Sequence, residues 1–355
     1  MEPANAVLLL EDGTAFHGMP FGHAGEAIGH AVFYTGVVGY QEVLTDPSYR
    51  ATLVTLTYPV VGSYGVNDED NESSAVQASG VVIRDYSSCV SNFRATGSLE
   101  DMLKDQQVVG IRGVDTRAVA VHLREHGEMR ASIASDGTDR DALMARLQAA
   151  PDPLAADLVA DLPIDPPPPP QGEAKTKLVA LNLGPTRSLL AQLADLGCTV
   201  HLLPAGSTAD EVLAAKPHAV LLAGGPGDPR VLEGPLATTR ALLGRVPVLG
   251  IGLGHQLLAL ALGGSVSRMK TGHHGVNYPV RTAGQARCDI TVQRHSFVVD
   301  GEAVPEGVEI THTNINDGTV EGLCSRESRA ASVQFHPSRD ETGRPSSILA
   351  RFLEG

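Results

Sequence analysis

The sequence contains no apolar run long enough to cross a membrane. Such a helix needs roughly 18 consecutive apolar residues, and no run in this chain approaches that length. The first residues, MEPANAVLLLEDG, also lack the basic start and the long apolar core of a secretory signal peptide. We therefore expect no membrane partner and no secretory leader, and we expect a cytoplasmic protein.

Positive charge is scarce relative to negative charge. Lysine and arginine total 27 against 41 aspartates and glutamates, which gives a net charge of −14 and a pI near 5.3. This balance argues against nucleic acid or an anionic membrane surface as the main partner.

Cysteine is sparse as well. The four cysteines form no CxxC pair and show no zinc-ligand spacing, which is typical of reduced thiols in a cytosolic protein. The adjacent His273 and His274 have no carboxylate at a matching spacing, so we expect no metal site.

Proline concentrates in one place and divides the chain. Residues 165–172 read DPPPPPQG, a composition that favours an extended, semi-rigid segment. We therefore predict an N-terminal domain over residues 1–148, a proline-rich linker over residues 149–175 and a C-terminal domain over residues 176–355.

The N-terminal part mixes strand and helix signals. Alternating or apolar segments indicate strands at residues 7–10, 30–34, 52–57 and 80–84, and helical patterns occur at residues 98–104 and 117–126. The turn residues EDGT at 11–14 predict a hairpin after the first strand. This order favours an α+β domain over a doubly wound sheet.

The C-terminal part alternates strand and helix. Strands are indicated at residues 178–181, 199–203 and 219–223, and helices at residues 187–196 and 209–214. This rhythm predicts an open, mostly parallel sheet with helices on both faces. Ligands of such sheets bind beyond the carboxyl ends of the strands, where the loop GGPGDP at 224–229 and Gly252 both fall.

Residues 246–264, reading VPVLGIGLGHQLLALALGG, organise this C-terminal domain. The apolar run at 246–251 predicts a buried strand, residues 252–254 a glycine-flanked turn, and residues 255–262 a helix. Strand, sharp turn and helix together are the form of a nucleophile elbow. The residue at the tip is Gly252, so this elbow carries no nucleophilic side chain.

This stretch resembles the core of class I glutamine amidotransferases, whose elbow reads G-I-C-L-G-H-Q. Residues 333–338, reading VQFHPS, resemble the family's Q-[FYG]-H-P-E. The resemblance implies that His336 is a remnant of the base that activates the cysteine. Gly252 then stands at the cysteine position, and Ser338 stands at the position of the glutamate that orients the histidine. A serine hydroxyl cannot supply that negative charge.

The glutamine-binding positions are partly changed. The family's Q-N-H-G-F is QRHSF at residues 293–297, so Arg294 and Ser296 replace an asparagine and a glycine that contact glutamine in the family. A guanidinium is larger than a carboxamide and always charged. The resemblance assigns eight positions to substrate binding: Ser48, Gly225, Gly227, Leu253, Gln256, Arg294, Ser296 and Phe297. Of these, Gly225 and Gly227 belong to the loop of the oxyanion hole.

Motifs of the N-terminal part point to one subgroup of this family. Residues 36–49 read GVVGYQEVLTDPSY, and further motifs stand at 55–59, 65–67, 91–94 and 113–117. They resemble, in order, the first domain of the small subunit of carbamoyl-phosphate synthetase. The resemblance implies that this domain forms much of the contact with the large synthetase subunit.

In that family, the small subunit hydrolyses glutamine and passes ammonia to the large subunit. The large subunit makes carbamoyl phosphate, a precursor in pyrimidine and arginine biosynthesis, from bicarbonate, ammonia and ATP. We expect this chain to keep the large-subunit partner in a heteromeric complex and to be a pseudoenzyme that has lost the glutaminase, so that the complex uses free ammonia. We expect no cofactor in this chain, with ATP and Mg bound only by the large subunit.

Two alternatives stay open at this point. In the first alternative, the former glutamine pocket, with Arg294, has become a binding or regulatory module for glutamine or another small molecule. In the second, the chain is a working glutaminase subunit with an unrecognised nucleophile.

Overall fold

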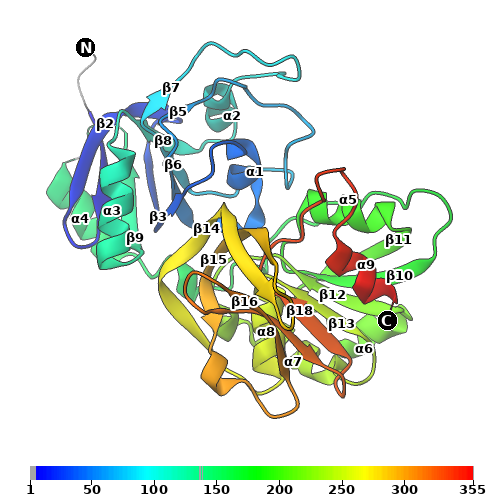
Figure 1. Cartoon of the computed structure of the whole chain (residues 1–355). Helices are drawn as coiled ribbons and strands as arrows, with labels where there is room; N and C mark the ends of the chain where they lie inside the picture. Colours follow the sequence, from blue (N-terminus) through cyan, green and yellow to red (C-terminus); the bar gives the residue numbers. More distant parts are fainter. Residues whose placement is uncertain (1–4, 136, 138, 355) are drawn as a thin grey trace. The chain divides into compact units, whose positions relative to one another are not determined.

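Two units make up the chain in the computed structural model, which describes residues 5–135, 137 and 139–354. The first unit comprises Met1–Ala156 together with Lys270–His274, and the second comprises Asp157–Met269 and Gly275–Gly355. Figure 1 gives the labels of the helices and strands, and each unit is described by itself.

A closed barrel forms the centre of the first unit. Its strands follow one another around the barrel in the order β1 (Ala6–Leu10), β2 (Ala15–Gly22), β8 (Val109–Arg112), β6 (Gly80–Val82), β4 (Thr52–Leu56), β3 (Glu26–Tyr34) and β9 (Met129–Ala134). The hairpin predicted at residues 11–14 joins the antiparallel strands β1 and β2. The pairs β3–β4, β4–β6 and β6–β8 are parallel.

Helices cover the barrel and explain why both faces of β1 are buried. Leu8 and Leu10 belong to the same core cluster as Val119 and Leu123 of α3, whereas Leu9 lies in a cluster with Leu143 of α4. The remaining elements of this unit are α1 (Tyr40–Thr45), η1 (Pro47–Tyr49), β5 (Val60–Val61), β7 (Asp85–Tyr86), α2 (Leu99–Asp105), α3 (Thr116–His126), α4 (Arg140–Ala149) and η2 (Pro153–Ala155). This mixture confirms the predicted α+β class of the N-terminal part.

The segment Lys270–His274 provides partners for a buried carboxylate of the first unit. The backbone N–H of Glu128 donates to the carbonyl of Lys270 at 2.8 Å, and the N–H of Gly272 donates to Glu128 Oε1 at 2.7 Å. The same oxygen lies 3.3 Å from His274 Nε2, and the Glu128 side chain has no exposed surface. A buried carboxylate requires such partners, so the segment is an integral part of this unit.

A nine-stranded sheet forms the second unit within the described residues. The strand order is β11 (Cys198–Pro204), β10 (Thr176–Asn182), β12 (Ala219–Ala223), β13 (Val248–Ile251), β18 (Ala330–Val333), β17 (Val320–Ser325), β15 (Cys288–Val299), β14 (Val266–Thr282) and β16 (Glu309–Asn314). Pairing is parallel from β11 to β18, and β17 pairs antiparallel with β18, β15 and β16.

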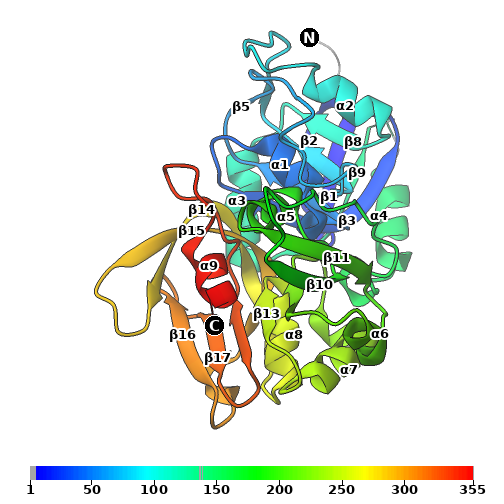
Figure 2. The same cartoon turned by 90° about the vertical axis from the view of Figure 1, so that its right-hand side faces the viewer.

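Helices pack on both faces of the parallel part of this sheet (Figures 1 and 2). One core cluster joins Val220 and Leu222 to residues of α6, α7 and α8, and another joins Leu221 and Leu249 to residues of α5 and α9. The helices and short turns are α5 (Arg187–Asp195), α6 (Ala209–Ala214), η3 (Pro229–Val231), α7 (Glu233–Leu242), α8 (Leu253–Ala261), η4 (Gly301–Ala303) and α9 (Ser347–Glu354). The predicted doubly wound sheet is therefore confirmed.

Among the described residues, no helix has both the length and the apolar character that a membrane span needs.

Candidate active site

The elbow consists of β13, Gly252 and α8. The strand ends at Ile251, Gly252 caps the helix with φ 61° and ψ −118°, and α8 begins at Leu253, two residues earlier than predicted. The N–H of Gly252 donates to the carbonyl of Val333 at 3.0 Å, which ties the tip to β18. A Cβ at Gly252 would meet nothing closer than Gly224 Cα at 3.8 Å, so the tip has room for a side chain that the sequence does not provide.

The inner side of the elbow has no such room. A Cβ at Gly254 would lie 1.8 Å from the carbonyl oxygen of Leu222, and a Cβ at Gly250 would lie 2.6 Å from the carbonyl oxygen of Gly254. Contacts this short exclude any residue with a side chain unless the backbone moves. The glycines therefore allow α8 to pack directly on β12 and β13.

The loop after β12 lies against the elbow. The N–H of Gly224 donates to the carbonyl of Ile251 at 3.1 Å, and Gly225 has φ 111°. A Cβ at Gly225 would lie 2.5 Å from both the Leu183 carbonyl oxygen and Leu253 Cδ2. Gly227 also has a positive φ, 85°. The loop thus has the conformational freedom that the predicted oxyanion hole requires, and Leu253 helps to hold it in place.

His336 follows β18 and lies beside a hydroxyl that the sequence analysis did not identify. The backbone N–H of His336 donates to the carbonyl of Val292 at 2.9 Å. Its imidazole Nε2 is 3.3 Å from Ser188 Oγ, in the first turn of α5. Since α5 begins just beyond the carboxyl end of β10, the position of Ser188 at a strand end was the available sequence signal.

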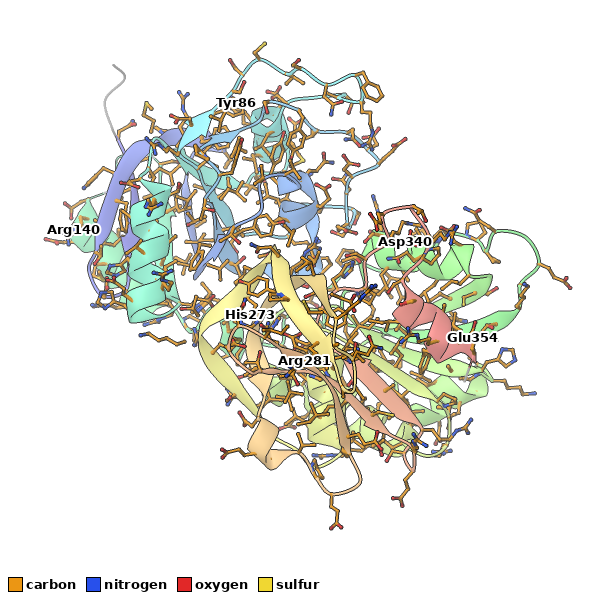
Figure 3. All side chains as sticks on the ribbon, viewed as in Figure 1. Tyr86, Arg140, His273, Arg281, Asp340 and Glu354 are labelled. Atoms are coloured by element: carbon orange, nitrogen blue, oxygen red, sulfur yellow. The ribbon has the colours of Figure 1, made fainter. Side chains whose placement is uncertain are left out.

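Ser338 does not take the place of an orienting carboxylate. It is exposed, and its hydroxyl donates to the backbone carbonyl of His336 at 3.4 Å. Gln192 of α5 binds the same segment and was not predicted from the sequence. Its Nε2 donates to the Pro337 carbonyl at 2.9 Å, and its Oε1 accepts from the N–H of Ser346 at 2.9 Å. Asp340 stands in the loop that leads from here to α9 (Figure 3).

The side chains of Gln256 and the neighbouring His255 form buried hydrogen bonds within the second unit. Gln256 Nε2 donates to the Phe297 carbonyl at 2.9 Å and to Gln334 Oε1 at 3.0 Å. His255 Nδ1 lies 2.8 Å from Ser332 Oγ, and burial lowers the pKa of His255 to about 3. A histidine that stays neutral at pH 7 inside the core serves as a packing and hydrogen-bonding group.

Strand β15 separates the changed pocket positions from a buried polar network. Gln293, His295 and Phe297 are buried, whereas the alternating Arg294 and Ser296 are half-buried. Because successive side chains of a strand point to opposite faces, Arg294 and Ser296 lie on the other side of β15 from Phe297. The ring of Phe297 instead lies under Arg230, whose Cζ is 5.6 Å from the ring centre.

The buried network on β15 contains a carboxylate with a shifted pKa. Glu321 accepts from Gln293 Nε2 at 2.8 Å and from Asn314 Nδ2 at 2.9 Å, and it has no exposed surface. Burial raises the pKa of Glu321 to about 7, although both hydrogen bonds act in the opposite direction. The network continues from Gln293 Oε1 to His295 Nε2 at 2.9 Å and from His295 Nδ1 to the Phe297 carbonyl at 2.8 Å.

Two proton arrangements satisfy this network. The Phe297 carbonyl only accepts, so His295 Nδ1 carries a hydrogen in both. In the observed orientation, a cationic His295 donates to Gln293 and an ionised Glu321 accepts from it. If the Gln293 amide is rotated by half a turn, a protonated Glu321 donates to its carbonyl and its NH₂ donates to a neutral His295. The two arrangements hold the same number of protons, so pH does not shift the balance between them, and the raised pKa of Glu321 favours the second.

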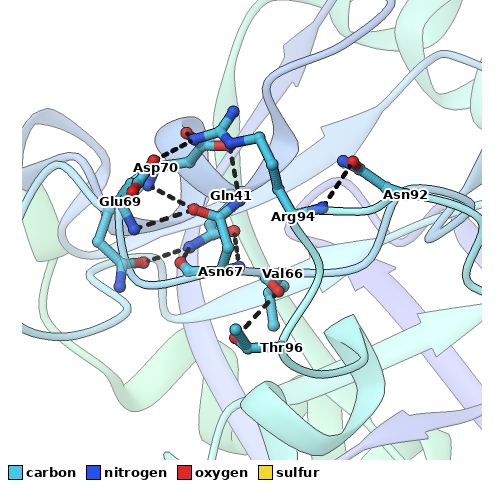
Figure 4. A network of polar contacts seen from close by, with 9 residues as sticks. Gln41, Val66, Asn67, Glu69, Asp70, Asn92, Arg94 and Thr96 are labelled. Carbon is cyan, nitrogen blue, oxygen red and sulfur yellow. Dashed lines mark hydrogen bonds and ion pairs between the residues drawn. The ribbon is translucent and has the colours of Figure 1, made fainter.

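The first unit contains Ser48, whose N–H donates to Asp46 Oδ1 at 2.7 Å at the start of η1. In the same unit, three sequence motifs meet in one polar network (Figure 4). Gln41 of α1 accepts from the N–H of Asn67 at 2.9 Å, and Asn67 Nδ2 donates to Asp70 at 2.8 Å. Arg94 binds the same aspartate at 2.6 Å. Motifs far apart in the sequence thus fix one another's loops.

Comparison with known proteins gives matches along nearly the whole chain. Residues 8–133 match the family described as carbamoyl-phosphate synthase small chain, CPSase domain, and residues 179–355 match glutamine amidotransferase class-I. The carbamoyl phosphate synthase small chain of Syntrophotalea carbinolica is 41% identical over 362 residues, covering 98% of this chain and 95% of that protein. The same protein of Akkermansia muciniphila is 44% identical, with 98% and 95% covered, and that of Mycobacterium tuberculosis is 43% identical, with 94% and 93% covered.

Proposed function

The chain belongs to the family of carbamoyl-phosphate synthase small chains and carries a class I glutamine amidotransferase domain, and from this premise we propose that it binds a large synthetase subunit without hydrolysing glutamine. The synthetase would then draw on free ammonia. The reaction with glutamine needs a nucleophile that attacks the carboxamide carbon and holds the glutamyl group until water releases it. Gly252 cannot form that bond.

The empty tip of the elbow is the observation that carries this proposal. Loss of a triad nucleophile alone lowers turnover by a factor on the order of 10⁶. Position 338 also carries a serine and no carboxylate, and the Ser338 hydroxyl donates to the backbone carbonyl of His336. The oxyanion loop and the glycine packing around Gly254 support the fold of the elbow irrespective of chemistry at the tip.

Exposed apolar residues on the first unit support the proposed partner. Val37 and Val38 are 57% and 65% exposed, and with Tyr58 and Val60 they line a cavity of about 140 Å³. Phe93, in the loop next to Arg94, is 97% exposed. Apolar groups gathered on a surface in this way mark interaction sites, and the large subunit is the partner implied by the family.

The test measures ammonia release from glutamine by the purified chain, alone and with the large subunit of the same organism. We expect no release above background. Gly252→Cys restores a nucleophile where the backbone has room, and Gly252→Cys/Ser338→Glu restores the orienting charge as well. We expect release from the double variant to exceed that from the single variant. Release from the natural chain would contradict the proposal.

Partner binding is tested separately by co-purification with the large subunit. We expect Val38→Asp to weaken the complex at least about tenfold, because it places a charge in the apolar patch. Val121→Asp, a change at an exposed valine on α3, is the matched control. No complex at micromolar concentration with the natural chain would overturn the partner assignment while leaving the glutaminase result intact.

Ser188 supports a second candidate function, a glutaminase with a serine nucleophile. Its hydroxyl is 3.3 Å from His336 Nε2, slightly beyond the range of about 2.6–3.2 Å in which a base accepts the proton of an attacking serine, a range that is often longer without substrate. This function predicts that ammonia release by the natural chain is abolished by both Ser188→Ala and His336→Ala. Release that survives Ser188→Ala would exclude it.

A third reading places a new ligand next to Arg294. Arg294 is half-buried and shares a face of β15 with Ser296, and guanidinium groups bind carboxylates and phosphates through paired hydrogen bonds. A ligand that binds the folded chain raises its melting temperature, and Arg294→Ala should remove that shift. An unchanged shift in Arg294→Ala would rule this reading out.

A further inference from the structure

The second unit contains a cavity of about 540 Å³ that Gly252, the tip of the elbow, does not line. Its floor is the sheet, with Leu249, Leu323 and Val333, and its cover is α9, with Ile348 and Phe352. The cavity reaches Pro247 and Arg329, which precede β13 and β18, whereas Gly252 and His336 follow these strands and do not line it. Figure 2 shows α9 over this part of the sheet. The volume is typical of a small-molecule site.

Three arginines line the cavity beside these apolar residues. Arg326 and Arg329 come from the turn between β17 and β18, and Arg351 comes from α9. All three are exposed, and none of them takes part in the ion pairs found among the described residues. Three guanidinium groups therefore border one apolar cavity in a chain whose net charge is −14.

The turn that carries two of these arginines is held in one conformation. The N–H of Arg329 donates to the Arg326 carbonyl at 3.1 Å, and the N–H of Val248 donates to the Arg329 carbonyl at 3.0 Å. Arg329 has φ 52°, a left-handed conformation that a residue with a side chain keeps only when its surroundings enforce it. The backbone positions from which Arg326 and Arg329 extend are therefore fixed by hydrogen bonds.

The histidine that lines the cavity, His312, is neutral at pH 7. His312 Nδ1 lies 2.9 Å from Thr311 Oγ1, and the ring packs edge-on against Phe335. Burial lowers the pKa of His312, with Arg351 acting in the same direction and Asp289 in the opposite one. At neutral pH the positive charge at this cavity comes from the arginines, while His312 remains available for a hydrogen bond.

We propose that this cavity binds a small amphipathic carboxylate, with its apolar chain between the sheet and α9 and its carboxylate at Arg326, Arg329 and Arg351. The apolar lining favours a hydrocarbon chain, and guanidinium groups pair with carboxylates through two parallel hydrogen bonds. This site is independent of the glutamine pocket and of the proposed loss of glutaminase.

Calorimetric titration of the full chain tests the proposal with octanoate, 1-octanol, acetate and octyl phosphate. We expect octanoate to bind saturably with one site per chain. Octanol lacks the charge and acetate lacks the chain, so each should bind at least about tenfold more weakly. Equal affinity for octanoate and acetate, preference for octyl phosphate, or no binding of octanoate would each overturn the proposal.

Variants locate the site. Arg351→Ala should weaken octanoate about tenfold or more and leave octanol unchanged, because only the charged contact is lost. Arg287→Ala, which removes an exposed arginine away from the cavity, is the matched control and should have no effect. Ala331→Phe fills the cavity and should abolish binding of both ligands, with circular dichroism to confirm folding. Loss of affinity in Arg287→Ala equal to that in Arg351→Ala would show nonspecific charge attraction and refute the site.

Discussion

The inner side of the elbow and its tip tolerate side chains very differently. At Gly254 a Cβ would overlap the Leu222 carbonyl at 1.8 Å, whereas at Gly252 the nearest atom is 3.8 Å away. The inner glycines match the glutamine amidotransferase motif, and the tip does not. Packing of α8 against the sheet depends on the first set alone. The backbone of this turn therefore does not depend on a side chain at its tip.

The largest expected effect comes from a methyl group on the inner side. Gly254→Ala should lower the free energy of unfolding by about 4 kcal/mol or more, because the helix must move off β12. Gly252→Ala is the control and should cost only about 2 kcal/mol, which is the strain of its backbone conformation. Urea denaturation of both variants gives the difference. Equal losses would mean that the tip is as tightly packed as the inner side.

A pH-dependent effect of similar size is expected at Glu321, behind the changed positions of β15. Its folded pKa is about 7 and its ordinary value 4.5, so the protonated form stabilises the fold below pH 4.5, and this stability is lost as the pH rises through about 7. Glu321→Gln cannot ionise and keeps the donor of the protonated carboxyl. Relative to this variant, the natural chain should lose about 3 kcal/mol between pH about 4.5 and about 7. A constant difference across that window would place the pKa of Glu321 near its ordinary value.

The support beneath the histidine segment should contribute less. Gln192→Ala removes two buried hydrogen bonds, to Pro337 and Ser346, and should lower the free energy of unfolding by about 2 kcal/mol. The exposed Gln285→Ala serves as its control, with little or no change expected. Thermal unfolding measures both. A loss at Gln285 as large as that at Gln192 would argue against a specific role for the buried amide.

The smallest effect is expected at the changed orienter position. Ser338 is exposed and its one contact is long, so Ser338→Ala should alter the free energy of unfolding by no more than about 0.5 kcal/mol. The same denaturation assay applies. A loss above about 1 kcal/mol would reveal a structural role for the hydroxyl and would weaken the contrast between scaffold and tip.

The sequence predicted correctly the helices and strands that are defined by capping residues or by a continuous apolar run. The helix at 209–214 and the strand at 219–223 agree with α6 and β12 at both ends, because a capping box at Thr208 and a fully buried apolar run define them. The short α1 and the charged α4 were not predicted, since neither carries a clear apolar stripe. The closed order of the barrel depends on strand pairing between distant segments, which periodicity does not encode.

The site shows the same division. The sequence motif identified Gly252, His336 and Ser338 because each stands next to recognisable neighbours. Ser188 and Gln192 lie about 150 residues before the histidine segment they contact, as the sequence separations of 148 and 145 show. Their roles arise only when α5 and the end of β18 come together in the fold, so no local pattern announces them.

The segment Lys270–His274 has a consequence for synthesis of the chain on the ribosome. The first unit ends at Ala156 in the continuous sequence, yet the buried carboxylate of Glu128 accepts a hydrogen bond from the N–H of Gly272 and lies beside His274 Nε2. The nascent first unit must therefore wait for 118 more residues (274 minus 156), roughly 10 s at ordinary elongation rates. During this interval the Glu128 carboxylate lacks these two partners, and a fragment that stops before residue 270 would never acquire them.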